Sequence, residues 1–214
     1  MNAAGPPRVG ICDYGVGNLR SVERALIAGG ARPLLSSDPS RLADCDGLVL
    51  PGVGAFAVAV RVLRERGIDS VVAEMVGRGR PILGVCLGFQ LLFEHSDEGA
   101  GGRGLGLLRG SVRRLEARRG KVPHMGWNRL TVRRPSALLD SRTDSDFVYF
   151  VHSYAAIPDD AGDVVATADY GGELVAAVER GMVHGTQFHP EKSGAAGLRV
   201  YANFASLCAL PVRA

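Results

Sequence analysis

A cysteine flanked by two glycines is the residue of this sequence best suited to nucleophilic chemistry. Cys86 lies at the centre of residues 84–88 (Gly-Val-Cys-Leu-Gly), a G-x-C-x-G pattern between a buried apolar run and a helical one. A sharp strand-to-helix turn strains its central residue and brings backbone close on both sides, where side chains would clash. The pattern predicts a thiol that projects at the end of a strand, beside a helix N-terminus that favours the thiolate. Taken alone, it fits a buried cysteine with two incidental glycines equally well.

A histidine and an acid two residues apart could activate such a thiol. His189 and Glu191 occur in residues 187–191 (Gln-Phe-His-Pro-Glu), at the end of a predicted strand. In an extended chain, residues two apart lie on one face, so Glu191 could hold one imidazole nitrogen while the other faces the thiol. A lone histidine near a strand end is usually structural. The neighbouring acid and the cysteine in the sharp turn at residues 84–88, which we call the elbow, favour a Cys-His-Glu triad instead.

Backbone donors for a developing oxyanion could come from residues 51–54 (Pro-Gly-Val-Gly), which follow another predicted strand. The N–H of Gly52 or Val53, together with the N–H of Leu87, could bind the negative oxygen of a tetrahedral intermediate. A plain connection between a strand and a helix is the alternative interpretation of this segment.

We expect neither a cofactor nor a metal. Residues 15–18 (Gly-Val-Gly-Asn) follow a strand, but the third glycine of a dinucleotide fingerprint is replaced by Arg20, so no Rossmann cofactor site is predicted. The four cysteines are far apart and form no C-x-x-C pair, which gives neither a zinc framework nor a redox motif.

The elements that must position these residues follow from hydrophobic periodicity. In the first half, short apolar runs predict strands at 8–13, 47–50 and 81–85, and helical patterns predict helices at 19–29, 55–66, 68–78 and 87–93. The second half predicts strands at 107–115, 129–134, 147–152, 164–169, 175–180 and 182–188, and a final helix that Ser193 caps and that runs to about Leu207. The expected fold class is α/β: a central, mostly parallel sheet flanked by helices, with additional antiparallel strands in the second half.

Length and composition are those of a globular protein. The chain has 214 residues, 46% hydrophobic and 22% charged, which favours a single domain over residues 1–214. The longest apolar run, residues 53–60, ends at Arg61 and is far shorter than the roughly 18 residues of a membrane span. The N-terminus has no secretion signal, so we expect a cytoplasmic protein. The net charge of +3 is spread along the chain, which argues against nucleic-acid binding.

Three motifs together resemble the class I, triad-type glutamine amidotransferases: residues 84–90 (Gly-Val-Cys-Leu-Gly-Phe-Gln), 51–56 (Pro-Gly-Val-Gly-Ala-Phe) and 187–193 (Gln-Phe-His-Pro-Glu-Lys-Ser). Three further segments are similar to the members of this family that act in histidine biosynthesis: residues 13–19, 122–128 (Val-Pro-His-Met-Gly-Trp-Asn) and 149–154 (Tyr-Phe-Val-His-Ser-Tyr). The motifs span most of the chain, and Phe89 departs from the methionine that is common in the family. The resemblance implies the flavodoxin-like fold of this family.

The resemblance also implies roles for individual residues. The catalytic residues would be Cys86 as the nucleophile, His189 as the general base and acid, and Glu191 as the group that orients the imidazole. The residues that bind glutamine or its oxyanion would be Gly52, Val53, Leu87, Gln90, Ser153 and Tyr154. The residues that face a partner subunit would be Asn18, His124, Trp127, Tyr149 and Lys192. From its spacing alone, Trp127 could equally pack on the chain's own sheet.

The implied activity is hydrolysis of glutamine to glutamate and ammonia. In the family, the ammonia passes to a (β/α)8-barrel cyclase that makes imidazole glycerol phosphate and an aminoimidazole carboxamide ribotide, so a heterodimer with that cyclase is expected. One alternative is an amidotransferase subunit of another pathway or a stand-alone γ-glutamyl-type cysteine hydrolase, which should lack residues 122–128 and 149–154 as they stand here. A silent binding module, the other alternative, should have lost a member of the triad, and none is lost.

Overall fold

The computed structural model describes residues 5–15, 17–116, 120–140 and 143–211. Val16, within the segment 13–19, and the first four residues of the N-terminus discussed above lie outside the described residues.

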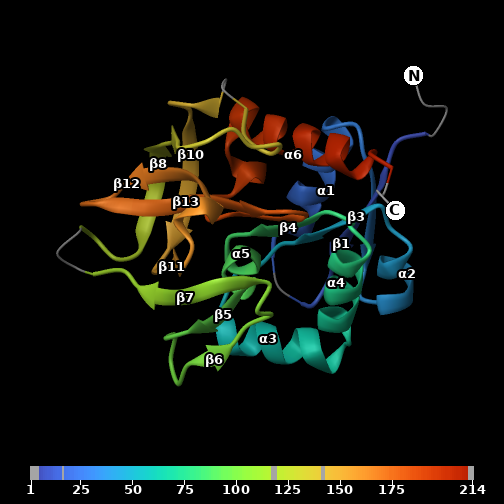
Figure 1. Cartoon of the computed structure of the whole chain (residues 1–214), viewed down its shortest axis with the longest axis horizontal. Coiled ribbons are helices and arrows are strands. Elements are labelled where there is room, and N and C mark those ends of the chain that lie inside the picture. The colour runs from blue at the N-terminus through green and yellow to red at the C-terminus, as the bar shows by residue number, and fades with distance from the viewer. Residues whose placement is uncertain (1–4, 16, 117–119, 141–142, 212–214) are drawn as a thin grey trace.

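An eight-stranded sheet forms the centre of the molecule, in the strand order β2-β1-β3-β4-β14-β13-β12-β9 (Figure 1). Neighbours from β2 to β14 pair in parallel, and those from β14 to β9 pair antiparallel. This arrangement confirms the expected class of a mostly parallel sheet with antiparallel strands from the second half. The strands are β1 (Arg8–Cys12), β2 (Arg32–Ser36), β3 (Gly47–Leu50), β4 (Ile82–Val85), β9 (Thr131–Val132), β12 (Val164–Asp169), β13 (Glu173–Arg180) and β14 (Val183–Thr186).

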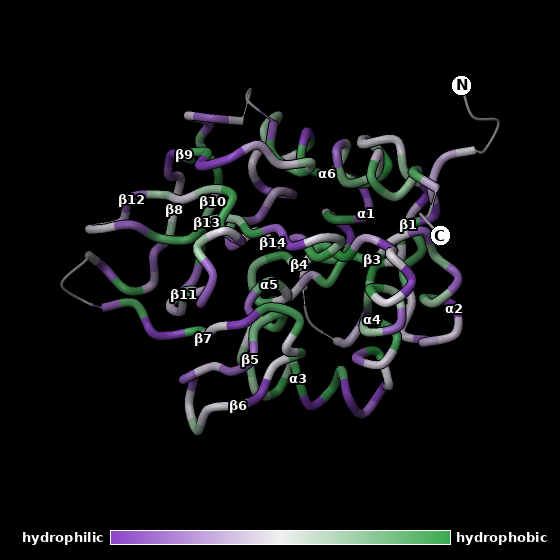
Figure 2. The backbone as a smooth tube through the Cα atoms, viewed as in Figure 1, coloured by the Kyte–Doolittle hydropathy of each residue, from purple (hydrophilic) through white to green (hydrophobic). Residues whose placement is uncertain are grey.

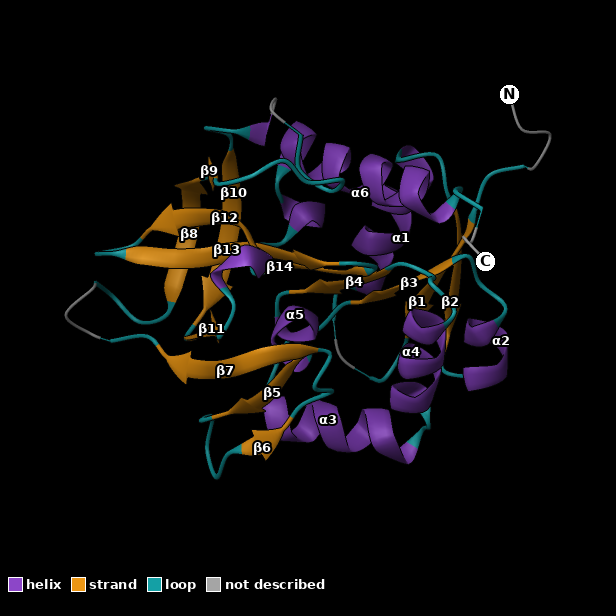
Figure 3. Ribbon diagram, in the orientation of Figure 1, coloured by secondary structure: helices purple, strands orange, loops and turns teal. Residues whose placement is uncertain are grey.

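Helices cover both faces of this sheet and bury a hydrophobic core on each (Figure 3). One face carries α1 and α6, which contact each other, and the opposite face carries α3, α4 and α5. In Figure 2 the hydrophobic segments gather around the sheet, while the outer turns of α3 are hydrophilic. The helices are α1 (Leu19–Ala28), α2 (Pro39–Ala43), α3 (Phe56–Glu65), α4 (Ile68–Gly77), α5 (Leu87–Leu91) and α6 (Gly194–Cys208).

Two smaller sheets flank the antiparallel part of the molecule. One has the order β11-β7-β5-β6, and the other is a two-stranded antiparallel ribbon of β8 and β10. Side chains of this ribbon alternate between a buried inner face and an exposed outer face. The strands are β5 (Phe93–Ser96), β6 (Gly102–Arg103), β7 (Leu108–Arg114), β8 (His124–Arg129), β10 (Phe147–His152) and β11 (Tyr154–Pro158).

Several local expectations were wrong. The helix predicted at 87–93 ends at Leu91, because Phe93–Ser96 pairs with β7 and β6 as β5. The strand predicted at 129–134 is two strands, β8 and β9, separated by Leu130. Ser193 precedes α6 as predicted, but its hydroxyl does not cap the helix; it donates to the His189 carbonyl instead, at 2.6 Å.

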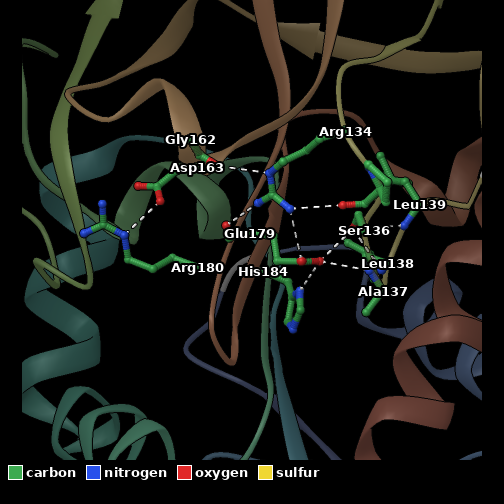
Figure 4. Close-up of polar contacts among 11 residues, drawn as sticks. Arg134, Ser136, Ala137, Leu138, Leu139, Gly162, Asp163, Glu179, Arg180 and His184 are labelled. Atoms are coloured by element: carbon green, nitrogen blue, oxygen red, sulfur yellow. Dashed lines mark hydrogen bonds and ion pairs between the residues drawn. The ribbon is translucent and has the colours of Figure 1, made fainter.

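A partly buried carboxylate ties the segment after β9 to the hairpin of β13 and β14 (Figure 4). Glu179 accepts hydrogen bonds from the Ser136 hydroxyl at 2.6 Å and the Ala137 N–H at 3.2 Å. Arg134 donates to the Glu179 main-chain oxygen at 2.7 Å, and Nδ1 of His184 lies 3.4 Å from the carboxylate. Burial opposes the charge on Glu179, but these partners outweigh it and lower the carboxyl pKa to about 2. The network joins the hairpin of β13 and β14 to residues 134–137.

None of the helices in the described part of the chain is both long enough and apolar enough to cross a membrane.

Candidate active site

Cys86 occupies a strained turn between β4 and α5. Its φ of 55° and ψ of −106° are rare for a residue with a side chain, as the G-x-C-x-G pattern predicts. The flanking glycines are needed because backbone lies against them: a Cβ on Gly84 would be 2.7 Å from the Gly88 oxygen, and one on Gly88 would be 1.8 Å from the Leu50 oxygen. The turn therefore presents the thiol at the carboxyl end of the central strands.

The register of β4 and β14 brings the histidine to the same edge. Thr186, the last residue of β14, pairs with Val85, and the Cys86 N–H donates to the Thr186 oxygen at 2.8 Å. His189 follows three residues later, and its side chain interacts with the Cys86 thiol. Residues 103 positions apart in the chain thus meet because two parallel strands end side by side.

His189 and Glu191 form a buried hydrogen-bonded pair. The distance from His189 Nδ1 to Glu191 Oε1 is 2.7 Å, and both side chains are 3% exposed. The predicted contact is present, but the chain from Pro190 to Lys192 is a 3₁₀ turn, so the extended-chain reasoning behind it was wrong. Because Nδ1 is engaged by Glu191, the interaction of the ring with Cys86 falls to Nε2, which has no other partner among the described residues.

This environment favours the protonated form of His189. Burial is the largest influence and acts to lower its pKa, but interactions with Cys86 and Glu191 outweigh burial and raise the pKa from 6.5 to about 9. Tyr201 is fully buried beside this pair, and burial followed by the charge of Glu191 raises its pKa. At neutral pH the imidazole therefore carries a proton that it can deliver.

The position of the imidazole is fixed through the main chain. The N–H of His189 donates to the Tyr149 oxygen at 2.9 Å, and the Ser193 hydroxyl donates to the His189 oxygen at 2.6 Å. The same hydroxyl accepts from the Tyr149 N–H at 3.0 Å. The 3₁₀ turn that carries the histidine is thereby tied to β10.

The expected oxyanion donors are turned away from each other. The Leu87 N–H donates to the Gly52 oxygen at 3.4 Å. Since the N–H and C=O of a trans peptide point in opposite directions, the Val53 N–H points away from Leu87. The preceding peptide is anchored by the Tyr14 hydroxyl, which donates to the Pro51 oxygen. In this conformation the two donors do not converge on one oxygen.

A cleft of about 360 Å³ brings together most of the predicted glutamine-binding residues. Gln90 lies in its wall, where its Nε2 donates to the Tyr154 oxygen at 2.9 Å and to Gln187 Oε1 at 3.0 Å. Gly52 is not among the lining residues; its oxygen accepts from the N–H of Leu87, which lines the cleft, and a Cβ on Gly52 would be 2.5 Å from the Tyr14 hydroxyl. The lining residues are Val53, Gly54, Cys86, Leu87, Gln90, Glu98, Pro123, Val151, His152, Ser153 and Tyr154.

Next to the cleft, the outer face of β8 and β10 is rich in exposed apolar and aromatic side chains. Met125, Trp127 and Phe147 are 62%, 56% and 51% exposed. Trp127 pairs with Tyr149 across the ribbon, with ring centroids 6.0 Å apart, and the Lys192 amine lies 5.5 Å from the Tyr149 ring. We call this surface the aromatic face. Large exposed apolar patches mark sites where proteins bind one another.

The other two residues expected to face a partner lie elsewhere. Asn18 is exposed at the start of α1. His124 is only 3% exposed, because it alternates with Met125 and points to the inner face of β8. Its side chain therefore does not reach the surface, contrary to the expectation from sequence.

Sequence reasoning assigned no role to several residues that shape this site. Gln187 holds Gln90 and lies 3.9 Å from the Cys86 sulfur, Tyr14 anchors the residue 51 carbonyl, and Glu98 is the charged group in the cleft wall. Gln187 and Tyr14 fall within motifs quoted above, which could have singled them out. Tyr201 lies on α6, where nothing in the local sequence sets it apart from a core aromatic residue.

Within the described ranges, no group of three or more His, Cys, Asp or Glu side chains is placed to hold a metal ion.

Comparison with known proteins identifies the family. A family model described as "Glutamine amidotransferase class-I" matches residues 11–207. The "Imidazole glycerol phosphate synthase subunit HisH" of Geobacillus sp. (strain WCH70) is 49% identical over 204 residues, which cover 93% of this chain and 96% of that subunit. The protein of the same name from Thermosynechococcus vestitus is 48% identical over 205 residues, covering 94% and 97%.

Solved structures agree on the fold. A crystal structure of a glutamine amidotransferase superposes with a TM-score of 0.75 at 24% identity, over 94% of this chain and 99% of that one. PurLQS from Thermotoga maritima gives a TM-score of 0.76 at 23% identity, over 94% and 98%. The expected flavodoxin-like fold of the family is thereby confirmed. With the family model matching nearly the whole chain and relatives close to half identical, this protein belongs to the class-I glutamine amidotransferases, among the HisH subunits of imidazole glycerol phosphate synthase.

Proposed function

We propose that this chain hydrolyses glutamine to glutamate and ammonia with a Cys-His-Glu triad and delivers the ammonia to the cyclase subunit of imidazole glycerol phosphate synthase. The observation that carries the proposal is Cys86, held in a strained turn at the cleft and in interaction with the buried His189–Glu191 pair. The names of its relatives supply the synthase. The four cysteines are all free thiols, which fits the reducing cytoplasm.

The triad would work through a thiolate and an imidazolium. The Cys86 sulfur attacks the side-chain carboxamide carbon of glutamine and forms a tetrahedral oxyanion. His189 gives its proton to the departing nitrogen, so ammonia leaves and a thioester remains. His189 then takes a proton from water, the hydroxide attacks the thioester, and glutamate and the thiolate are released. Glu191 keeps Nδ1 occupied, which leaves Nε2 for both proton transfers.

The oxyanion would be bound only after residues 52 and 53 change conformation. Rotation of their shared peptide would break the bond between the Leu87 N–H and the Gly52 oxygen and turn the Val53 N–H toward Leu87. Two N–H groups would then converge on the oxyanion. This movement explains why the isolated chain should hydrolyse glutamine slowly: the resting conformation has the substrate cleft but not the completed oxyanion site.

The rest of the cleft would bind the amino-acid end of glutamine. The Glu98 carboxylate supplies negative charge for the α-ammonium group, while the main chain at Gly52, Ser153 and Tyr154 would hold the carboxylate. Gln90 is fixed by Gln187 and by the Tyr154 oxygen, and it would contact the substrate from the wall of the cleft.

The partner would be a (β/α)8-barrel cyclase that binds over the aromatic face and forms a heterodimer. Trp127, Tyr149 and Lys192 lie together on this face, and Val151 and Pro123 connect it to the cleft. Buried aromatic anchors of this kind carry much of the binding energy of protein interfaces. A partner seated there would cover the cleft, so ammonia could pass to it through a closed channel. Asn18 would contact its rim.

The test is a glutaminase assay in three arms: the chain alone, with the cyclase, and with the cyclase and its nucleotide substrate. Glutamate release should be slow in the first arm and rise strongly in the third. Cys86→Ala should abolish glutamine-dependent cyclisation but leave ammonia-dependent cyclisation intact, whereas the matched variant Cys208→Ala, buried in α6, should retain both.

Two results would contradict the proposal. Glutamine use by Cys86→Ala would exclude this thiol as the nucleophile. Full glutaminase activity of the isolated chain, with no co-elution with the cyclase at micromolar concentrations, would indicate a stand-alone γ-glutamyl-type hydrolase.

A further inference from the structure

Two buried histidines lie at the back of the cleft and take no part in the proton transfers above. His152 lines the cleft and is 6% exposed, and His124 packs behind it on the inner face of β8. Nδ1 of His124 lies 3.0 Å from Nε2 of His152, so one ring donates a hydrogen bond to the other. A direct bond between two imidazoles requires a definite proton on one of the two nitrogens.

The Tyr154 carbonyl group determines which ring nitrogen of each histidine carries the proton. His152 Nδ1 lies 2.8 Å from the Tyr154 oxygen, which can only accept, so Nδ1 carries the proton. In a neutral ring, Nε2 of His152 is then an acceptor. His124 must therefore donate its Nδ1 proton, which leaves His124 Nε2 as an acceptor in turn.

The contact of His124 with Asn128 indicates the same direction of hydrogen-bond donation. Asn128 Nδ2 lies 3.4 Å from His124 Nε2 and 2.8 Å from the Asp169 oxygen. The Arg129 N–H donates to Asn128 Oδ1 at 2.7 Å, which fixes the amide orientation independently. Donation therefore runs in one direction, from Asn128 through His124 and His152 to the carbonyl of Tyr154.

The surroundings keep both rings neutral and in place. The rings of Phe150 and Tyr170 are stacked on His124, with centroids 4.7 and 4.0 Å away, and two nearly parallel rings this close must occupy opposite faces. Burial, the largest cause, lowers the pKa of His124 to about 4 and that of His152 to about 3. Each ring thus has one donor and one acceptor, as the chain of hydrogen bonds requires.

The last carbonyl of this chain belongs to the wall of the glutamine cleft. The Tyr154 oxygen accepts both His152 Nδ1 and Gln90 Nε2. The wall bends here, because β10 ends at His152 and β11 starts at Tyr154. Ser153 lies in neither strand, and its oxygen accepts from the Leu115 N–H at 2.8 Å. The hydrogen bond from His152 spans this bend.

We propose that His124 and His152 are positioning residues for glutamine: a one-way chain of hydrogen bonds from Asn128 to the Tyr154 carbonyl sets the bend at Ser153 and thereby the substrate-binding wall. The inference rests on the proposed function, because the ligand of the cleft is glutamine.

The experiment measures kcat and KM for glutamine in the complex with the cyclase. His124→Leu removes the donor at similar size, and we expect KM to rise about tenfold, which corresponds to one lost buried hydrogen bond, with kcat nearly unchanged. His124→Asn places an amide donor where Nδ1 stood and should recover most of the affinity. The matched control is His184→Leu, a buried histidine on β14 outside the cleft, which should lower stability without changing KM.

The outcomes separate the two proposals. If the wild-type complex does not hydrolyse glutamine, the proposed function fails. If it does and His124→Leu keeps the wild-type KM, or His124→Leu and His124→Asn are equally impaired, only the positioning role is overturned. Should His124→Leu not fold, ¹⁵N NMR of the wild-type complex decides: both rings must be Nδ1–H tautomers at about pH 7, and an Nε2–H or charged ring would refute the chain.

Discussion

Gly88→Ala is the smallest change that should disable this site. The substitution adds one methyl group on α5, away from the substrate cleft and without removing any polar contact. Its Cβ would lie 1.8 Å from the Leu50 oxygen and 2.7 Å from the Leu50 carbonyl carbon. Real Cβ atoms essentially never approach other atoms below 3.0 Å, so β3 and the elbow must separate by about 1.2 Å.

That displacement sets the magnitude of the effect. Cys86 lies two residues before Gly88 in the same turn, so it would move with it. A misplacement of about 1 Å at a reacting group costs roughly 100-fold in rate. Overpacking of this kind also destabilises a folded protein by about 1–3 kcal/mol. We therefore expect kcat/KM for glutamine to fall at least about 100-fold, while ammonia-dependent cyclisation in the complex persists.

Gly77→Ala is the matched control. Gly77 is the last residue of α4, and a Cβ there would have no atom within 4 Å. Alanine should stabilise this helix by about 0.5–1 kcal/mol and leave activity unchanged. Glutamate release and urea unfolding, measured on both variants, provide the assay. If Gly88→Ala keeps kcat/KM within about threefold of wild type and unfolds at the same urea concentration, the close contact between elbow and β3 does not control the position of the thiol.

Three further predictions concern protons and the partner. Because the His189 pKa is raised to about 9, the imidazolium and its contribution to stability are fully present below about pH 6.5 and are lost as the pH rises through about 9. The glutaminase rate should fall over this alkaline range, and Glu191→Gln should shift the fall to lower pH. If the variant leaves the pH profile unchanged, a group other than His189 causes the fall. The pKa values of His124 and His152 are lowered to about 4 and about 3, so these residues bind protons in the unfolded chain below about pH 6.5 but bind them in the folded chain only below those lower values. The free energy of unfolding, measured with urea, should therefore decline as the pH falls through this window, and His124→Asn should make its dependence on pH shallower by about one proton. Trp127→Ala should weaken cyclase binding by about 2 kcal/mol, or about 30-fold in the Kd measured by calorimetry. The control is Leu198→Ala, which changes an exposed residue on α6; if Trp127→Ala has no larger effect than this control, the interface lies elsewhere.

The sequence predicted strands with a clear hydrophobic pattern better than short elements near the edge of the sheet. The strands predicted at 47–50, 147–152 and 164–169 coincide with β3, β10 and β12, because their apolar runs or alternation are clear. Two elements near one edge, β2 and α2, were not predicted. β2 contains Pro33 and is only partly buried, and α2 has only five residues, so neither shows a clear hydrophobic pattern.

The candidate catalytic residues Cys86, His189 and Glu191 could be predicted from sequence because they lie in short motifs, but their surroundings could not. The position of His124 could have been predicted had residues 124–129 been interpreted as a strand: His124 and Asn128 alternate with Met125 and Trp127, so the former pair faces inward. The pairing of Phe93–Ser96 with β7 and the position of Tyr201 beside Glu191 depend on contacts between distant segments. No local pattern encodes such contacts.

The burial of the other cysteines has a practical consequence. Burial raises the pKa of Cys12, Cys45 and Cys208, which keeps these three sulfurs protonated and shielded, while Cys86 alone among the four lines the cleft. A glutamine mimic with an electrophilic warhead would thus become attached at a single position. The fraction of molecules that gain the mass of the label would then give the fraction of reactive sites in a preparation, before any turnover is measured.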